Sequence, residues 1–181
     1  MTNPFMKILY DEHEVIVNAI DVAKQLKYLI NRDPDLYDIK LRKLIQFFRN
    51  YADKYHHYKE EVILFPEMNK RNEMLEEGII KEMFENHEDF REMIKSIEQS
   101  LNAHDYIKAH DQLEKYTEEL LNHIAVENEE VFQMAESIFD LAELEKIGHR
   151  FLDWDRELGD ARKEEWKELA DELRRDLTMM D

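Results

Sequence analysis

Apolar residues recur at three- and four-residue spacings along almost the whole chain, which is the pattern of helices that bury one face. The pattern is interrupted around Pro34, again between Pro66 and Gly78, and once more at residues 102–105, where Asp105 is a candidate helix N-cap. The interruptions divide the chain up to residue 140 into four helical segments, and we expect the second to end near Pro66. The apolar positions of the four segments are Met6, Leu9, Tyr10, Ile16, Val17 and Ile20; Leu44, Phe47, Phe48, Tyr51, Tyr55, Tyr58, Val62 and Phe65; Ile80, Met83, Phe84, Phe90, Ile94, Ile97 and Leu101; and Leu113, Tyr116, Leu120, Val131, Met134 and Ile138.

The helical pattern continues beyond residue 140, from Leu141 to Leu169, and predicts one or two further helices packed on the outside. Long helices joined by short connections form antiparallel bundles. We therefore expect an all-α fold, an antiparallel up-down four-helix bundle with a C-terminal helical extension. The bundle is expected over residues 1–140 and the extension over residues 141–181, the two forming a single domain overall.

Composition supports the all-helical expectation. The chain has 181 residues, of which only three are glycine and three proline, while 38% are charged. A sheet protein needs many tight turns, and this chain has few of the residues that make them. Its length suits one well-buried core, and its 43% hydrophobic content argues against disorder.

Charge and cysteine content exclude several classes of function. The formal net charge of −18 repels nucleic-acid phosphates and anionic lipids, so we expect neither partner. The absence of cysteine excludes thiolate catalysis, iron–sulfur clusters and thiolate zinc sites. The first residues show no apolar signal segment and no stretch is long enough to span a bilayer, so a cytoplasmic location is the expectation.

Candidate chemistry comes from histidines that precede a glutamate by four residues, because two such residues share one face of a helix. Taken singly, each pair is weak evidence, since an exposed pair of this kind is usually a minor surface ion pair. Four pairs have this spacing: His56–Glu60, His57–Glu61, His110–Glu114 and His123–Glu127.

Helical phase at about 100° per residue separates these pairs. His123 and Glu127 fall within the apolar stripe of their helix, whereas the His110 pair lies on the opposite face and is expected to be solvated. The pair of His57 and Glu61 shares an arc with Leu64, Phe65 and Met68. The pair of His56 and Glu60 shares its arc with Arg49, Asp53 and Glu67, so we expect the His57 pair to point inwards.

The other two helices each place one histidine on the apolar face, His13 and His87. A lone histidine of this kind is usually a hydrogen-bonded core residue. Here, however, four helices each direct a histidine inwards, and two of them add a glutamate one turn later. Burying four imidazoles and two carboxylates costs several kcal/mol unless a cation lies among them. Two divalent ions bridged by the carboxylates would satisfy every group, and imidazole with carboxylate favours iron or manganese over zinc or copper. The predicted metal ligands are His13, His57, Glu61, His87, His123 and Glu127.

This ordered set resembles the hemerythrin-like (HHE cation-binding) family, whose pattern is one histidine, then His-x-x-x-Glu, then one histidine, then His-x-x-x-Glu. The stretch from His57 to Pro66 is similar to the family's second helix, and Leu9 to His13 is similar to its opening. The similarity covers residues 5 to about 138. It implies a non-haem di-iron centre, bridged by an oxo or hydroxo species and by the two glutamates, that takes dioxygen, nitric oxide or peroxide as its small ligand.

One departure from the family pattern affects the expected function. Oxygen-carrying members have a second histidine one turn from the third-helix ligand, where this chain has Met83 and Arg91. Glu130 is a candidate replacement, Tyr58 and His149 are weaker candidates, and without a replacement one iron has an open or water-filled position. Binding or sensing of dioxygen, nitric oxide or the iron and redox state is therefore favoured over simple oxygen carriage. The alternatives are a di-iron oxidase, peroxidase or iron-centre repair enzyme, and a metal-free structural bundle; the extension is a candidate surface for a protein partner.

Overall fold

The computed structural model describes residues 3–178, and these residues form helices, turns and connecting segments without a strand. The all-helical prediction is confirmed. Three stretches are π-helical, with i→i+5 hydrogen bonding. The helices are α1 (Lys7–Gln25), a 3₁₀ turn (Leu26–Tyr28), α2 (Leu29–Arg32), α3 (Pro34–Phe47), the π segments η2 (Phe48–His57) and η3 (Lys59–Leu64), α4 (Phe65–Arg71), a 3₁₀ turn (Glu73–Leu75), α5 (Ile79–Asn102), α6 (Tyr106–Val126), the π segment η5 (Glu127–Val131), α7 (Phe132–Ile138), α8 (Leu141–Leu158) and α9 (Asp160–Thr178).

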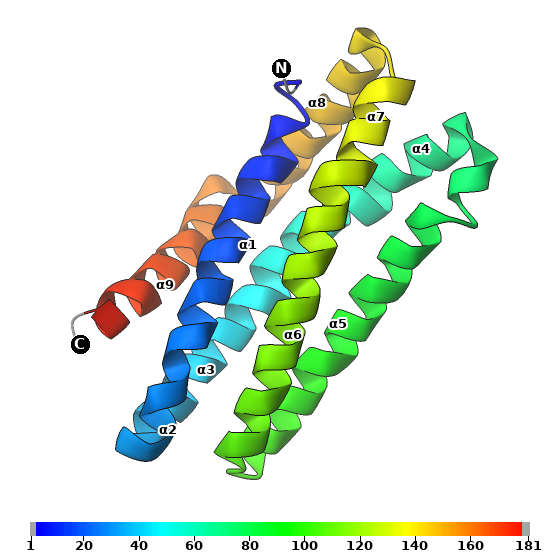
Figure 1. Cartoon of the computed structure of the whole chain (residues 1–181). Coiled ribbons are helices and arrows are strands. Elements are labelled where there is room, and N and C mark those ends of the chain that lie inside the picture. Colours follow the sequence, from blue (N-terminus) through cyan, green and yellow to red (C-terminus); the bar gives the residue numbers. More distant parts are fainter. Residues whose placement is uncertain (1–2, 179–181) are drawn as a thin grey trace.

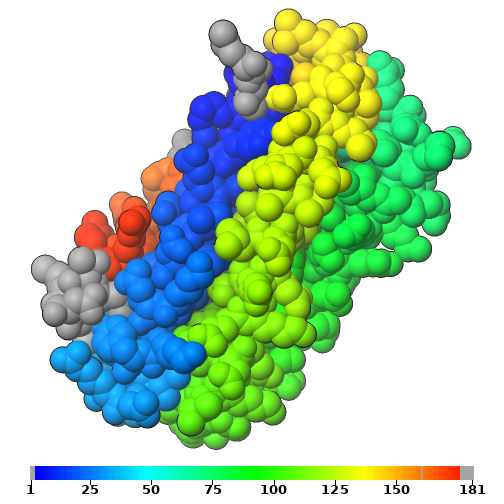
Figure 2. Space-filling model, in the orientation of Figure 1, coloured from blue at the N-terminus to red at the C-terminus, as the bar shows by residue number. Residues whose placement is uncertain are grey.

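The long helical segments lie side by side (Figure 1). One of them is continuous from α3 through the π segments to α4, and another from α6 through η5 to α7. Figure 2 shows α1, α6–α7 and α5 next to one another on one face of the molecule. Among residues 3–178, none of the helices is both long and apolar enough to cross a membrane.

Side-chain caps set several helix ends. Asp33 accepts a hydrogen bond from the Leu36 amide at 3.0 Å, with Pro34 at the start of α3, and Asp105 caps α6 as predicted. The predicted end near Pro66 is wrong, because the helix continues to Arg71. The π-helical hydrogen bonding changes to α-helical at this point, and the carbonyl of Val62, four residues before Pro66, accepts from Arg150 at 3.3 Å.

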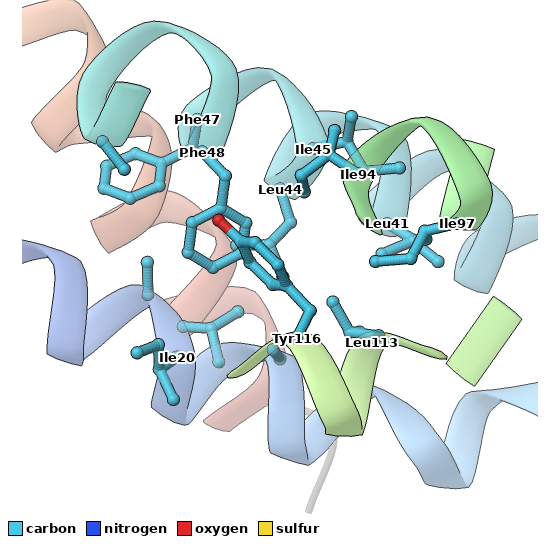
Figure 3. Close-up of a cluster of buried hydrophobic side chains, with 14 of the residues drawn as sticks. Ile20, Leu41, Leu44, Ile45, Phe47, Phe48, Ile94, Ile97, Leu113 and Tyr116 are labelled. Atoms are coloured by element: carbon cyan, nitrogen blue, oxygen red, sulfur yellow. The ribbon is translucent and has the colours of Figure 1, made fainter. Parts of the chain in front are cut away.

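Buried apolar side chains form two clusters. The larger includes Ile16, Tyr55 and Leu120, and Figure 3 shows part of it around Phe48 and Tyr116. The smaller cluster is Met6, Leu9, Ile63, Leu64, Phe65, Met68, Leu75, Ile80, Met83, Val131, Phe132, Ala135, Leu144, Ile147 and Phe151. On each of the four long segments, buried histidines or glutamates lie where residues of one cluster give way to residues of the other; the buried His110, inside the larger cluster, is the exception. A polar layer therefore separates two apolar regions and has little access to water.

The helices α8 and α9 pack along the other long segments (Figure 1). The first contacts η3, and the second contacts α1 and α3. Asp140 and Glu143 form a reciprocal capping box at the start of α8. Gly148 in α8 lies directly against the side chain of Phe5, which fills the space that a Cβ atom would need. This close approach ties the start of the chain to α8.

Replacing Gly148 by alanine should destabilise the fold although alanine is the better helix former. The new methyl group would overlap the Cβ and ring of Phe5, which cannot move without shifting backbone, and such overpacking costs about 1–3 kcal/mol. Urea unfolding measures the loss. In a Phe5→Gly background, which removes the Cβ atom as well as the ring, the same substitution should be neutral or stabilising, and an equal loss there would show that the contact with Phe5 is not the cause.

Candidate metal centre

The π segment η2 places two consecutive histidines in the polar layer. A π turn spans one residue more than an α turn, so ten residues of η2 change the phase of everything that follows. As a result His56, His57 and Glu60 are all buried, with exposed fractions of 1%, 3% and 0%. Glu61 turns partly outwards and its side chain is 19% exposed. The assumption of 100° per residue had placed Glu61, and not Glu60, on the inward face.

The buried side chains form two adjoining groups whose potential ligand atoms lie within 4.8 Å of one another in each group. The first group, from α1, the second long segment and η5, is His13, His56, Glu60 and Glu127. The second group, from η2, α5 and α6, is His57, His87 and His123. Each of the two groups is large enough to hold one metal ion.

The two glutamates lie between these groups, and each turns one oxygen towards each group. Glu127 Oε2 is 3.2 Å from His13 Nε2, while Glu127 Oε1 is 3.2 Å from His123 Nε2. Glu60 Oε1 is 3.3 Å from His56 Nε2, while Glu60 Oε2 is 3.7 Å from His87 Nε2. This arrangement is the one that bridging carboxylates of a two-metal bundle require.

The outer (Nδ1) nitrogens of the five histidines face polar side chains, and the inner (Nε2) nitrogens of His87 and His123 lie 3.0 Å apart. His56 Nδ1 is 2.9 Å from Glu12 Oε2, and His13 Nδ1 is 2.8 Å from the Asn128 side-chain oxygen. A metal-bound histidine usually donates its second N–H in this way, which fixes the ring and the tautomer. The remaining three contacts are His87 Nδ1 to Glu61 Oε1 at 2.7 Å, His57 Nδ1 to Asp53 Oδ1 at 3.4 Å, and His123 Nδ1 to the Asn86 amide at 3.3 Å.

The inner atoms fit a bound cation. His13 Nε2, His56 Nε2 and all four oxygens of Glu60 and Glu127 are buried, and none has a hydrogen-bond partner within the part of the chain that the structure describes. Buried polar atoms are almost always hydrogen-bonded, and an unpaired buried carboxylate is especially costly. Oxygen and nitrogen atoms that converge without hydrogen bonds therefore indicate a missing positive charge.

Without a metal, protons supply part of that charge. Burial lowers the pKa of His56, but Glu60 and Glu12 outweigh this effect and raise it to about 10. Burial likewise opposes protonation of His87, and the Glu127 and Glu61 carboxylates raise its pKa to about 9. Burial and the neighbouring His87 charge instead hold the pKa of His57 well below its ordinary value. Two histidines are thus charged at neutral pH and one is neutral.

Five of the predicted residues, His13, His57, His87, His123 and Glu127, come together in these two groups. The sixth, Glu61, belongs to neither group, because its carboxylate accepts from Arg91 at 2.7 Å and pairs with the outer nitrogen of His87. His56 and Glu60 were missed. No signal in the sequence pointed to them, because at 100° per residue they share an arc with the polar residues Arg49, Asp53 and Glu67.

No second histidine lies on α5 one turn from His87. Glu130, Tyr58 and His149 were candidates to replace the absent third-helix histidine, but Glu130 and His149 are exposed and Tyr58 stacks on Trp154. The imidazole next to His87 is that of His57, whose ring stacks on the His87 ring at 3.7 Å between centroids. His110, expected to be solvated, is buried, and its Nδ1 is 3.3 Å from the Tyr37 hydroxyl.

A cavity of about 210 Å³ reaches the second group. Its lining includes His57 and His87, next to the apolar and aromatic side chains of Phe48, Ala52, Phe90, Ile94 and Tyr116. Arg91, which occupies the position of the absent histidine, also lines it and is held by Asp53 Oδ1 at 2.6 Å. A small molecule therefore has space beside the His57 and His87 rings.

A helical bundle with converging buried imidazoles and carboxylates defines a metal-binding protein of the bundle type. The chain matches the family model of the hemerythrin HHE cation-binding domain over residues 5–135, and it belongs to this family. Curated proteins and solved structures yielded no match to the chain.

Exchanging the two adjacent glutamates for alanine one at a time tests the arrangement. Glu60→Ala removes one ligand of the first group and the oxygen that faces His87 Nε2 of the second, and it should lower metal affinity by more than about 100-fold, beyond the usual loss for an outer-shell partner. Glu61→Ala should lower it by about tenfold, because only the contact with His87 Nδ1 is lost. Elemental analysis and competition with a chelator measure both. A greater loss of metal affinity in the Glu61 variant than in the Glu60 variant would show that Glu61 is the metal ligand, as the sequence had predicted.

The metal-free protein should become less stable as the pH rises from about 6.5 to 10. The folded-state pKa values of His56 and His87, about 10 and about 9, lie above the ordinary value of 6.5. The folded protein therefore binds these protons more tightly than the unfolded chain, so their contribution is complete below about pH 6.5 and is lost as the pH passes through the folded values. Urea unfolding in the presence of a chelator measures this slope. A free energy of unfolding that rises over this interval would contradict the assignment.

Proposed function

We propose that this protein is a non-haem di-iron protein that binds or senses dioxygen, nitric oxide or the iron and redox state. The observation that carries the proposal is the placement of Glu60 and Glu127, each with one oxygen towards each histidine group. In this proposal the metals lie in the middle of an antiparallel up-down bundle of four helical segments. His13 and His56 would hold one ion, and His57, His87 and His123 the other.

The donor set supports iron. Neutral imidazoles and carboxylates without thiolate suit iron or manganese, and zinc less well because its protein sites usually have four ligands in a closed tetrahedron. Iron bound here would supply reversible affinity for small oxygen and nitrogen molecules. The side chains of the protein would hold the two ions, orient the imidazoles through their outer nitrogens, and keep bulk water out.

The size of the cavity favours a ligand of two or a few atoms. Sites for ordinary organic substrates enclose about 300–1,000 Å³, whereas this cavity encloses about 210 Å³. Dioxygen, nitric oxide and peroxide fit such a space, and the apolar rings suit the first two. Imidazoles also outnumber carboxylates in the two groups, unlike the carboxylate-rich ferritin-like oxidases. Binding or sensing is therefore favoured over an oxidase or peroxidase.

Filling the cavity should slow ligand binding without removing the metals. Ala52 is buried and lines the cavity, so Ala52→Leu places three more carbon atoms in the path to His57 and His87. We expect the rate of nitric oxide binding to the iron-loaded protein to fall at least about tenfold, which corresponds to about 1.4 kcal/mol in the barrier. Stopped-flow absorption measures it, with iron content checked on each sample.

The matched control is Ala125→Leu, at an exposed position of α6. It should bind nitric oxide at the wild-type rate. Equal rates for all three proteins would mean that the ligand does not use this cavity. Continuous turnover of hydrogen peroxide by the iron-loaded wild type would favour the enzyme alternative over binding or sensing.

A further inference from the structure

A buried network of charged groups lies next to the metal centre and continues into the C-terminal helices. It begins at Glu12, which is 3% exposed and whose Oε2 lies 2.9 Å from His56 Nδ1. The other oxygen of Glu12 pairs with the ammonium group of Lys59 and accepts from the Tyr55 hydroxyl at 2.8 Å. The carboxylate that orients His56 is therefore itself held by two side chains of the π segments.

Lys59 is unusual because it is completely buried. A buried ammonium group is costly unless it is paired and hydrogen-bonded. Its second partner is Asp155 of α8, whose Oδ1 lies 2.7 Å from Lys59 Nζ and 2.9 Å from the Tyr55 hydroxyl. Asp155 Oδ2 in turn accepts from Lys163 of α9 at 2.9 Å. The network thus alternates in charge from Glu12 to Lys163.

This sequence of contacts links the extension to the orientation of one imidazole. If the Asp155 charge is removed, Lys59 and Tyr55 keep only Glu12 as an anionic partner among the contacts described here. Lys59 then draws Glu12 Oε1 more strongly and is free to move towards water, and both changes pull Glu12 away from His56. The helices α8 and α9 lie beyond the family match, which ends at residue 135.

We propose that Asp155 is a positioning residue for the metal centre, acting through Lys59 and Tyr55 on Glu12 and thereby on the ring of His56. The expected effect of Asp155 on metal binding rests on the proposed function. The orientation of His56 does not, because it is a property of the metal-free chain as well. In this proposal α8 and α9 hold the His13 and His56 side of the centre in place.

The test compares Asp155→Asn with Asp153→Asn in the full-length protein. Asp153 lies on the same helix, is 68% exposed at its side chain and pairs only with Arg156 among the contacts described here. In metal-free protein, nuclear magnetic resonance of the histidine rings follows the Nδ1 proton that His56 shares with Glu12. Its exchange with water should speed up at least tenfold in Asp155→Asn and stay unchanged in Asp153→Asn.

His87 provides an internal control, because its Nδ1 bonds to Glu61 and not to this network. Its proton should exchange at the wild-type rate in both variants. A purely structural role for Asp155 would lower the thermal unfolding temperature and leave the His56 proton unaffected relative to that of His87. This result would overturn the proposal.

A second arm titrates the full-length proteins with Co²⁺ and follows its visible absorption bands. In Asp155→Asn one of two Co²⁺ ions should bind about 10–100-fold more weakly, the usual effect of losing an outer-shell partner, and the other should bind as before. Unchanged affinity for both ions would count against the proposal. A wild type that takes up no Co²⁺ would defeat the proposed function instead, while the ring-proton exchange would still decide the role of Asp155.

If Asp155→Asn does not fold, Lys163→Met replaces it. Lys163 is at the outer end of the network with its side chain 21% exposed, so its loss leaves Lys59 paired. The same His56 proton should then exchange faster by a smaller factor, and wild-type exchange in this variant would contradict the proposed path.

Discussion

The burial of Glu60 and Glu127 is the constraint on which the rest of the structure depends. Both carboxylates are fully removed from water, and their four oxygens face histidine nitrogens from four long helical segments. Removing each carboxylate from water costs several kcal/mol, so the fold is stable only if positive charge collects in the same layer. Protons on His56 and His87 serve this purpose without a metal, and metal ions would serve it better because they satisfy both oxygens of each glutamate.

The π segments are the local device that makes this layer. With α-helical phase, the pair of His56 and Glu60 lies about 100° from the pair of His57 and Glu61, and the core would be centred on one pair alone. The wider turn brings in both, together with Glu60, and turns Glu61 to Arg91 at the edge of the cavity. The third π segment begins at Glu127 itself, on the other glutamate-bearing helix. Rare helical geometry at these positions is a frequent mark of functional sites.

Much of this could be predicted from the sequence. Regular spacing of apolar residues identified the helices, and side-chain caps at Asp33 and Asp105 end the turns where polar residues suggested. Histidines on ordinary α-helical turns, such as His13, His87 and His123, were placed correctly in the core. Glu60 and His56 could not be placed, because periodicity analysis assumes an α-helical phase and a π segment breaks it. The end of the second segment failed for the same reason at Pro66. The apolar spacing also gave no indication that α8 would supply Asp155 to a buried network, since that contact depends on tertiary packing.

The central claim is that two metal ions lie on either side of Glu60 and Glu127. X-ray diffraction from iron-loaded crystals, recorded just above and below the iron absorption edge, tests it most directly. The account predicts two anomalous peaks per chain, one beside His13 and His56 and the other beside His57, His87 and His123. A single peak elsewhere, or no peak in protein loaded with ferrous iron without oxygen, would contradict it.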